Sequence, residues 1–287
     1  MDKLNLFTTI RCDPSLLNLP SQGFTNLGWN QAPSPFYMLD FHRDRVLKAA
    51  IHWKWDAAVK ALEGEAGLKA LETLLRKNII EAADADTDLP CRAKVLVDRE
   101  GKLSVIRGPA EAADPRNLFP SFLPAPLSSH TTTTTTQDPP RNAGSKVPER
   151  NFEFEVVVDE QATAKSAYTH FKTTHRPMYD GARRRANITL GDKREVLLIN
   201  QDDGSIMEGS ITTPHFWRHG RWVTPPIPKE FSTTQGSGGN SGTTRRWALE
   251  RGLVEEETVH VDSLVDGEEC WVSNALIGFV HAKVKLQ

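Results

Sequence analysis

The chain has 287 residues and a formal net charge of −2, with 35 lysines and arginines against 37 aspartates and glutamates. This balance gives no electrostatic basis for binding nucleic acid or an anionic membrane surface. No apolar run is long enough to span a membrane, and the N-terminus lacks the basic and then apolar pattern of a secretory signal. The three cysteines, Cys12, Cys91 and Cys270, have neither metal-like nor redox spacing and fit a reducing compartment. We therefore expect a soluble, cytoplasmic protein of two modest domains, with neither nucleic acid nor membrane as a partner.

The first 126 residues carry the pattern of a small α/β domain. Alternating apolar and polar residues predict strands, and helical spacing of apolar residues predicts helices. In chain order we expect a strand over residues 4–12, a short strand over 36–39, helices over 41–53 and 55–83, and a hairpin of strands over 93–97 and 103–107. Asp40 is the predicted N-cap of the first helix. Residues 14–35, rich in Pro, Gly, Asn and Ser, are expected to be irregular.

A low-complexity stretch separates this region from the rest of the chain. Residues 131–136 are consecutive threonines, and residues 137–148 are polar and rich in proline. Such a composition buries too little apolar surface to offset the entropy of ordering it. We interpret residues 127–150 as a flexible linker or disordered insertion between a small N-terminal domain, 1–126, and a larger C-terminal domain, 151–287.

The C-terminal region reads mainly as strands joined by turns. Apolar runs bounded by turn residues predict strands over residues 152–158, 196–200, 207–213, 216–219, 221–224 and 270–280. A Gly-rich turn over residues 236–242 opens a helix predicted over 243–251. Gly252 follows that helix in the position of a left-handed cap.

Four features of this region follow one another in a particular order. Lys172 begins a Lys-x-x-His-Arg motif, and Glu208 comes just before an apolar hairpin. The Gly-rich turn opens its helix next, and the last apolar strand is broken at Ser273-Asn274. In this order they resemble the large domain of fold-type IV pyridoxal 5′-phosphate (PLP) enzymes. The resemblance implies an α+β fold similar to that of D-amino-acid aminotransferase, with a small N-terminal α/β domain and a larger β-rich C-terminal domain with helices.

The resemblance implies roles for Lys172 and Glu208. A PLP enzyme needs one amine that attaches to the cofactor and later moves a proton at the neighbouring substrate carbon. Lysine suits both tasks because its pKa falls readily when it is buried or near other cations, so Lys172 is the predicted catalytic residue. Glu208 is the predicted carboxylate that keeps the pyridine nitrogen protonated. Taken alone, each would more simply be a surface residue, and Thr212 and Thr213 stand where the family usually has Ala-Asn.

The cofactor phosphate requires backbone N–H groups at the start of a helix and at least one cation. Thr243 and Thr244 stand at the start of the predicted helix, after small residues. Asn274 lies in a segment that resembles the family's second phosphate-contacting turn. Arg45 matches the phosphate arginine of a His-x-x-Arg motif that begins at His42. In isolation each of these would be an ordinary loop or surface residue.

Two segments favour one branch of the family. Phe-Thr-Thr-Ile-Arg at residues 7–11 resembles a segment of aminodeoxychorismate lyases, and Ser-Asn-Ala-Leu at 273–276 is similar to their Cys-Asn-Ala-Leu. Pro177 occupies the place of an active-site tyrosine in branched-chain aminotransferases. The candidate substrate contacts are Thr8, Thr9, Arg11 and Tyr179, with Arg99 and Arg107 as further candidates.

The function implied is that of a PLP-dependent 4-amino-4-deoxychorismate lyase, which releases pyruvate and p-aminobenzoate for folate synthesis and acts as a homodimer on a small-molecule substrate. A class IV aminotransferase acting on branched-chain or D-amino acids is the alternative, with the same cofactor. A second alternative is a non-catalytic protein of the same fold, which the Thr212-Thr213 departure would favour. We expect no metal, because the spacing of His42, His170 and His175 fits no zinc site.

Overall fold

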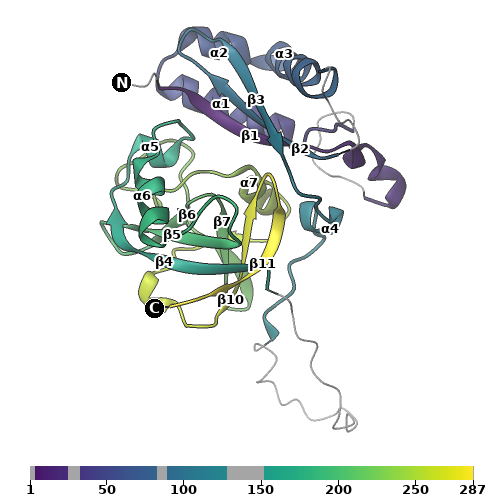
Figure 1. The fold of residues 1–287 in the computed structure, drawn as a ribbon. Coiled ribbons are helices and arrows are strands. Elements are labelled where there is room, and N and C mark those ends of the chain that lie inside the picture. Colours follow the sequence, from purple (N-terminus) through teal and green to yellow (C-terminus); the bar gives the residue numbers. More distant parts are fainter. Residues whose placement is uncertain (1–3, 25–32, 83–88, 128–151, 287) are drawn as a thin grey trace.

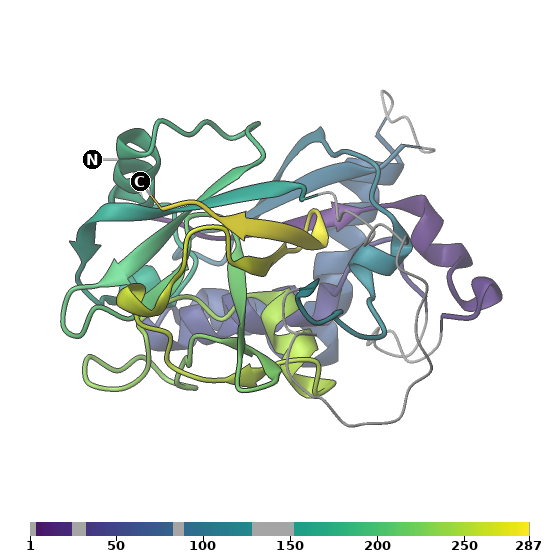
Figure 2. The ribbon, with the colours of Figure 1, turned by 90° about the horizontal axis from the view of Figure 1, so that it is seen from below.

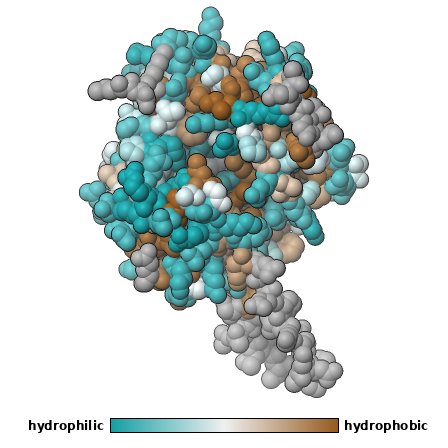
Figure 3. Space-filling model, in the orientation of Figure 1, coloured by the Kyte–Doolittle hydropathy of each residue, from teal (hydrophilic) through white to brown (hydrophobic). Residues whose placement is uncertain are grey.

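The computed structural model describes residues 4–24, 33–82, 89–127 and 152–286. Figure 1 shows a smaller layer of sheet and helices above a larger, curled sheet, and Figure 2 shows the same ribbon from below. The linker expected over residues 127–150 lies outside the described residues except for Leu127. Within the described ranges, no helix is long and apolar enough to cross a membrane. The face seen in Figure 3 is largely hydrophilic, with apolar atoms in smaller patches.

A three-stranded antiparallel sheet forms the smaller layer, in the order β1-β2-β3. Its strands are β1 (Leu6–Cys12), β2 (Cys91–Val97) and β3 (Leu103–Pro109). Every second residue of β2 is buried, because alternate side chains of a strand face the same side. The buried side packs against α1 (Leu39–His52), α2 (Asp56–Leu62), α3 (Gly64–Leu75) and the π-helical turn η3 (Arg76–Ile80). The other side of β2 is left to face the larger layer.

The helix predicted over residues 55–83 is divided into these last three elements, which corrects the prediction. The break comes where Glu63 is extended and Gly64 has a φ of 63°. Glycine adopts that left-handed backbone without the penalty that a Cβ would bring. Apolar periodicity alone missed the break because the leucines continue on both sides of it.

The start of the first helix also differs from the prediction. It begins at Leu39, and Met38, with a φ of 52°, holds the cap position expected for Asp40. Asp40 lies in the first turn, where a negative charge interacts favourably with the positive end of the helix dipole. Of the strand expected over residues 36–39, only a single bridge from Phe36 to Cys12 is present. The region expected to be irregular contains two short 3-10 turns, η1 (Pro14–Asn18) and η2 (Pro20–Gln22).

An eight-stranded sheet forms the larger layer, in the order β6-β5-β4-β11-β10-β7-β8-β9. The pairs β4·β5, β4·β11 and β8·β9 are parallel, and the other neighbours are antiparallel. Its strands are β4 (Phe154–Thr163), β5 (Arg194–Asn200), β6 (Ile206–Gly209), β7 (Thr213–Arg218), β8 (Arg221–Thr224), β9 (Glu255–Glu256), β10 (Glu269–Asn274) and β11 (Gly278–Val284). The remaining helical elements are α4 (Pro115–Leu118), α5 (Ala167–His170), α6 (Pro177–Arg185), α7 (Thr243–Glu250) and η5 (Val261–Ser263).

Two strands predicted as continuous are each split in two, at points that shape the site. The strand expected over residues 207–213 ends at Gly209 and a new one begins at Thr213. The strand expected over 270–280 turns after Asn274, whose side-chain oxygen accepts the backbone N–H groups of the turn. At the first break the carboxylate of Glu195 accepts backbone N–H groups of the loop beside the remaining backbone hydrogen bonds, and at the second the side chain of Asn274 does so.

The two layers share an apolar core. One cluster belongs almost entirely to the smaller layer, and two others lie within the larger one. A fourth cluster joins them, because Tyr37 and Phe41 near α1 pack with Trp247, Trp271 and Phe279 of the larger layer. The relative position of the layers is therefore fixed by buried aromatic contacts, and the space between them has a defined shape.

Candidate active site

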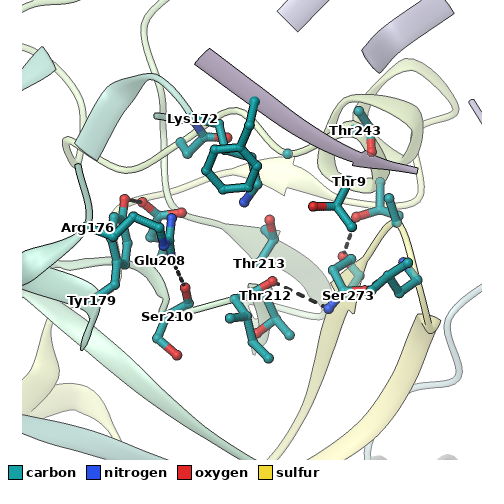
Figure 4. A pocket seen from close by; sticks show the side chains of 18 of the residues that line it. Thr9, Lys172, Arg176, Tyr179, Glu208, Ser210, Thr212, Thr213, Thr243 and Ser273 are labelled. Atoms are coloured by element: carbon teal, nitrogen blue, oxygen red, sulfur yellow. Dashed lines mark hydrogen bonds between the residues drawn. The ribbon is translucent and has the colours of Figure 1, made fainter. Parts of the chain in front are cut away.

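A cavity of about 360 Å³ receives side chains from both layers. Its basic residues outnumber its carboxylates: Arg45, Arg92, Lys94, Lys172, Arg176 and Arg183 line it, against Asp180 and Glu208. In Figure 4, Glu208, Tyr179 and Arg176 lie towards one end and Thr243 and Ser273 towards the other, with Lys172 between. A basic cavity of this kind suits an anionic ligand.

Lys172 is held in place by the backbone on both sides of it. Just before it, α5 begins with a capping box at Ser166. The carbonyl of Lys172 itself accepts the N–H of Phe7 at 3.0 Å, and Thr173 forms a bridge with Leu6, so β1 fixes the segment. Two elements far apart in the sequence therefore aim this amine into the cavity.

The amine of Lys172 has little water around it and several cations near it. Loss of hydration lowers the pKa of Lys172 well below its usual value, and the positive charges of Arg176 and Arg45 lower it further. The carboxylate of Glu208 opposes this shift without reversing it. This shift favours the uncharged amine, which is the nucleophilic form.

Glu208 lies on β6 and is only 9% exposed. Its Oε1 accepts a hydrogen bond from the phenol of Tyr179 at 2.5 Å. Burial raises the pKa of Glu208 to about 7, although Tyr179, Lys172 and Arg176 all act to lower it. The 236–242 loop packs so closely on this strand that a Cβ on Gly239 would lie 2.4 Å from the carbonyl oxygen of Met207. Only glycine fits at that position.

Arg45 enters the cavity from α1 and is supported by two neighbours. It donates to the hydroxyl of Thr8, and that hydroxyl lies 2.6 Å from Nδ1 of His42. Burial lowers the pKa of Arg45 to about 10, so the guanidinium stays charged at neutral pH. Its Nε is buried and has no hydrogen-bond partner within the described residues. This arginine therefore retains a donor for a ligand.

The opposite wall is formed by the start of α7 and the end of β10. Thr243 is the first residue of α7, and its buried hydroxyl has no partner in the part of the chain that the structure describes. Thr244 lies 3.0 Å from the hydroxyl of Ser273, which in turn lies 2.9 Å from Nε2 of His215. The first N–H groups of a helix lack intrahelical acceptors, so this wall offers several donors to an anion.

Asn274 lines the cavity, but its side chain is already used. The Oδ1 atom accepts the N–H groups of Leu276 at 2.8 Å and Ile277 at 3.1 Å. The Nδ2 atom faces the carbonyl oxygen of Ile211 at 3.4 Å. Its side chain shapes the turn, and a phosphate contact there is left to the backbone of the turn.

The structure divides the predicted substrate residues into two groups. Thr9 and Tyr179 line the cavity, whereas Thr8 lies behind Arg45 and does not. The predicted substrate contact of Arg11 is not supported, because its buried guanidinium binds Asp13 at 2.7 Å and also donates to two backbone carbonyls. Arg99 and Arg107 are also not among the lining residues, as Arg99 follows the end of β2 and Arg107 lies on β3.

Two cations on β2 line the cavity although they were not among the predicted site residues. Arg92 and Lys94 alternate with its buried residues and both line the cavity. The period-two pattern of the strand placed them together on one face, so the signal was present. What it lacked was any indication that this face meets the larger layer rather than solvent.

The Thr212-Thr213 departure has a structural explanation. Thr212 donates its hydroxyl to Glu195 at 2.7 Å. A Cβ on Gly242 would lie 2.9 Å from the hydroxyl oxygen of Thr213, so this threonine fills the space that a glycine leaves open. Both threonines line the cavity and take part in its wall.

These features fit PLP, because its pyridine nitrogen would need a carboxylate and its phosphate would need free hydrogen-bond donors. Glu208 stands at one end of the cavity, and the unpartnered donors of Arg45 and Thr243 are available for a phosphate. Lys172 lies between these ends, where its amine could attach to the cofactor's aldehyde. In the described ranges there is no group of three or more His, Cys, Asp or Glu residues able to hold a metal ion.

The chain belongs to the class IV aminotransferase family, whose model, described as Amino-transferase class IV, matches residues 25–284. Its fold is that of fold-type IV enzymes, as the sequence predicted. Aminodeoxychorismate lyase of Saccharomyces cerevisiae is 25% identical over 270 residues, which cover 87% of this chain and 68% of that protein.

Several solved structures have a similar fold, among them one from Mesorhizobium loti and one from Mycobacterium tuberculosis. A protein from Mesorhizobium loti, provisionally named as an amino-acid aminotransferase, has a TM-score of 0.59 at 20% identity, covering 98% of this chain and 100% of its own. A hypothetical aminotransferase from Mycobacterium tuberculosis, solved in a PLP-bound form, has a TM-score of 0.57 at 14% identity, covering 99% of this chain and 81% of its own.

Proposed function

We propose that this protein is a PLP-dependent aminodeoxychorismate lyase. The observation that carries the proposal is the position of Lys172, a lysine of lowered pKa that lies between a buried carboxylate and a set of unpartnered hydrogen-bond donors. The name and coverage of the yeast relative support the choice of this activity within the family. The matching segments at residues 7–11 and 273–276 support it as well.

Lys172 has two tasks in this proposal. Its amine would attach to the cofactor, and once the substrate amine takes that place, the free Nζ would remove the proton from the substrate ring carbon that bears the nitrogen. PLP, when bound, makes that carbon acidic by drawing electrons into its ring. The electron pair left by that proton would break the ring C–O bond and leave the aromatic ring of p-aminobenzoate, and the departing enolpyruvate would take up a proton to become pyruvate. The depressed pKa of Lys172 keeps its amine able to accept that proton.

Glu208 and the anion-binding donors position the cofactor. The carboxylate of Glu208 would hold a proton on the pyridine nitrogen. The hydrogen bond from Tyr179 fixes the orientation of that carboxylate. Arg45, Thr243 and Thr244 would hold the phosphate, with the backbone of the Asn274 turn beside them. A cofactor held both at its ring and at its phosphate would be open to the substrate on one face of the ring.

The substrate of this lyase carries two carboxylates, and the cavity has cations beyond those that the cofactor needs. Arg92 and Lys94 on β2 line it near Thr9. Arg176 also lines it, although its guanidinium already stacks on Tyr179 and donates to the carbonyl of Ser210. We assign Arg92 and Lys94 to the substrate carboxylates, because these charges line the cavity and are not among the residues assigned to the cofactor. Replacing either with Met should raise KM much more than it lowers kcat.

An aminotransferase acting on branched-chain or D-amino acids would use the same cofactor residues. Against the branched-chain activity stands Pro177, the first residue of α6, in the place of the active-site tyrosine of branched-chain aminotransferases. The two activities differ in what happens to the cofactor. A lyase returns it unchanged after each turnover, whereas an aminotransferase must pass through the pyridoxamine form.

The deciding experiment uses purified protein loaded with PLP. Aminodeoxychorismate is added alone, and pyruvate, p-aminobenzoate and the cofactor spectrum are followed together, with Lys172→Ala as the control. Many turnovers with no loss of the PLP band support the lyase. Conversion to pyridoxamine phosphate by leucine, valine or D-alanine, with no p-aminobenzoate formed, would move the assignment to the aminotransferase. Failure to bind PLP would leave only a non-catalytic protein of this fold.

We further propose that the active protein is a cytoplasmic homodimer with domains at residues 1–126 and 151–287. One apolar cluster belongs almost entirely to the smaller layer and another lies within the larger layer, which supports this division. Limited proteolysis should cut first within residues 127–150, and early cleavage elsewhere would contradict this domain division.

Light scattering should give about twice the 32.0 kDa chain mass, whereas a mass of one chain at micromolar concentration would refute the dimer. Fluorescently tagged protein confined to an organelle would refute the cytoplasmic location.

A further inference from the structure

The phenol of Tyr179 is directed at a single acceptor deep in the site. It donates to Oε1 of Glu208 at 2.5 Å, while the carbonyl oxygen of Thr169 lies further away at 3.2 Å. Tyr179 is 3% exposed and Glu208 is 9% exposed, so water has little access to this hydrogen bond. A phenol has one proton to donate, and the distances favour the carboxylate as its acceptor.

The ring of Tyr179 is itself held rigidly. It lies on α6, in the apolar cluster with Val157, Val196 and Met207. On its open side the guanidinium carbon of Arg176 lies 4.0 Å from the ring centroid. Arg176 is anchored in turn by donation to the carbonyl of Ser210 at 2.7 Å. The phenol therefore has little freedom to leave Glu208.

We propose that Tyr179 is a positioning residue that acts through Glu208: it fixes the carboxylate in one orientation and keeps it ionised for the cofactor's pyridine nitrogen. This inference rests on the proposed function and changes the part predicted for Tyr179, from a substrate contact to a partner of Glu208. Because Oε1 accepts from the phenol, Oε2 would be the oxygen that faces the cofactor's pyridine nitrogen, and the backbone N–H of Asn240 also donates to this carboxylate.

A neutral donor is well suited to this task. Burial by itself would drive Glu208 towards its protonated form, and the hydrogen bond from Tyr179 lowers its pKa again. The phenol does not give up its proton to do so, because burial and the nearby carboxylate raise the pKa of Tyr179 well above its usual value. Tyr179 therefore stays a donor over the whole pH range in which the enzyme would work.

The test is a double-mutant cycle on the PLP-loaded protein with Tyr179→Phe, Glu208→Gln and the double variant. Tyr179→Phe removes the donor and keeps the ring. With Glu208 present, the acidic limb of the kcat profile should move to higher pH by about one unit, the worth of one hydrogen bond to a charged group. At neutral pH kcat should fall while KM changes little. In the Glu208→Gln background, Tyr179→Phe should have almost no further effect.

Tyr168→Phe is the matched control. Tyr168 is a partly buried tyrosine whose ring packs near His175 and Trp53, and it does not line the cavity. Its variant should keep the wild-type pH profile. A Tyr179→Phe variant with an unmoved acidic limb would overturn the inference. So would equal losses of kcat with and without Glu208, because Tyr179 would then act independently of it.

Failure of the inference is distinguishable from failure of the proposed function. If the wild-type protein binds no PLP or makes no p-aminobenzoate, the proposed function fails before the variants are made. If it does both and the cycle shows no coupling, only the role of Tyr179 fails. The absorbance of the bound cofactor, titrated with pH in each variant, gives a second readout that a purely structural role would leave unmoved.

Discussion

Glu195 on β5 accepts hydrogen bonds from both the backbone nitrogen and the hydroxyl of Ser210, at 2.8 and 2.6 Å. Its second oxygen accepts the N–H of Ile211 and the hydroxyl of Thr212. This fully buried carboxylate thereby shapes the three-residue loop that separates β6 from β7 and lines the cavity. The loop carries the strand break that the sequence did not predict.

Replacing Glu195 should loosen the site as well as the fold. In Glu195→Gln one acceptor oxygen becomes an NH2 group, which faces donors and leaves buried N–H groups unpaired. We expect a loss of about 2 to 4 kcal/mol in the free energy of unfolding, together with weaker PLP binding. Urea denaturation and cofactor titration measure the two effects. Glu160→Gln, an exposed change on β4, is the control. A Glu195 variant as stable as that control would contradict the role given to this carboxylate.

Borohydride reduction should fix PLP covalently on Lys172. The reason is its depressed pKa and its position between Glu208 and the anion-binding donors. Peptide mapping should find the label on the peptide that contains Lys172, while Lys165, which contacts Asp202, stays unlabelled. Lys172→Ala should lose both the label and the visible absorbance band. A label on any other lysine would remove Lys172 from its assigned place.

Without cofactor, the raised pKa of Glu208 should make stability depend on pH. The folded-state pKa is about 7, against an ordinary value of 4.5. The neutral acid is the form that the folded protein tolerates, so this contribution is complete below the ordinary pKa and is lost as pH rises through about 7. We expect the unfolding free energy of wild type, relative to Glu208→Gln, to fall across that window by on the order of 3 kcal/mol. Parallel curves for the two proteins would show that Glu208 is not titrating there.

Arg45 should matter for the phosphate of the cofactor and not for its ring. Arg45→Ala removes charge-assisted hydrogen bonds, so PLP should bind roughly 10- to 100-fold more weakly while pyridoxal, which has no phosphate, binds as before. Thr8→Val should act in the same direction, though less strongly, because Thr8 orients the guanidinium. Lys48→Ala, an exposed change on the same helix, is the control. An equal loss of affinity for both ligands would mean that Arg45 shapes the cavity instead.

Local sequence was sufficient for much of the fold. The hairpin of β2 and β3, the turn before α7 and the helix of Arg45 were predicted because their signals lie within a few residues of each other. The breaks at Gly64 and after Gly209 were missed. At Gly64 the apolar spacing simply continues, and after Gly209 the cause is a carboxylate from another strand.

The order of motifs along the chain by itself determined the family and the residues worth examining, above all Lys172 and Glu208, because such motifs are short and keep their order whatever surrounds them. Only the tertiary structure decided their partners. It joined Tyr179 to Glu208, and it removed Arg11 from the cavity while placing Lys94 there. The reason is physical: which side chains meet depends on strand register and on how two layers pack, and these are set by contacts between distant parts of the chain.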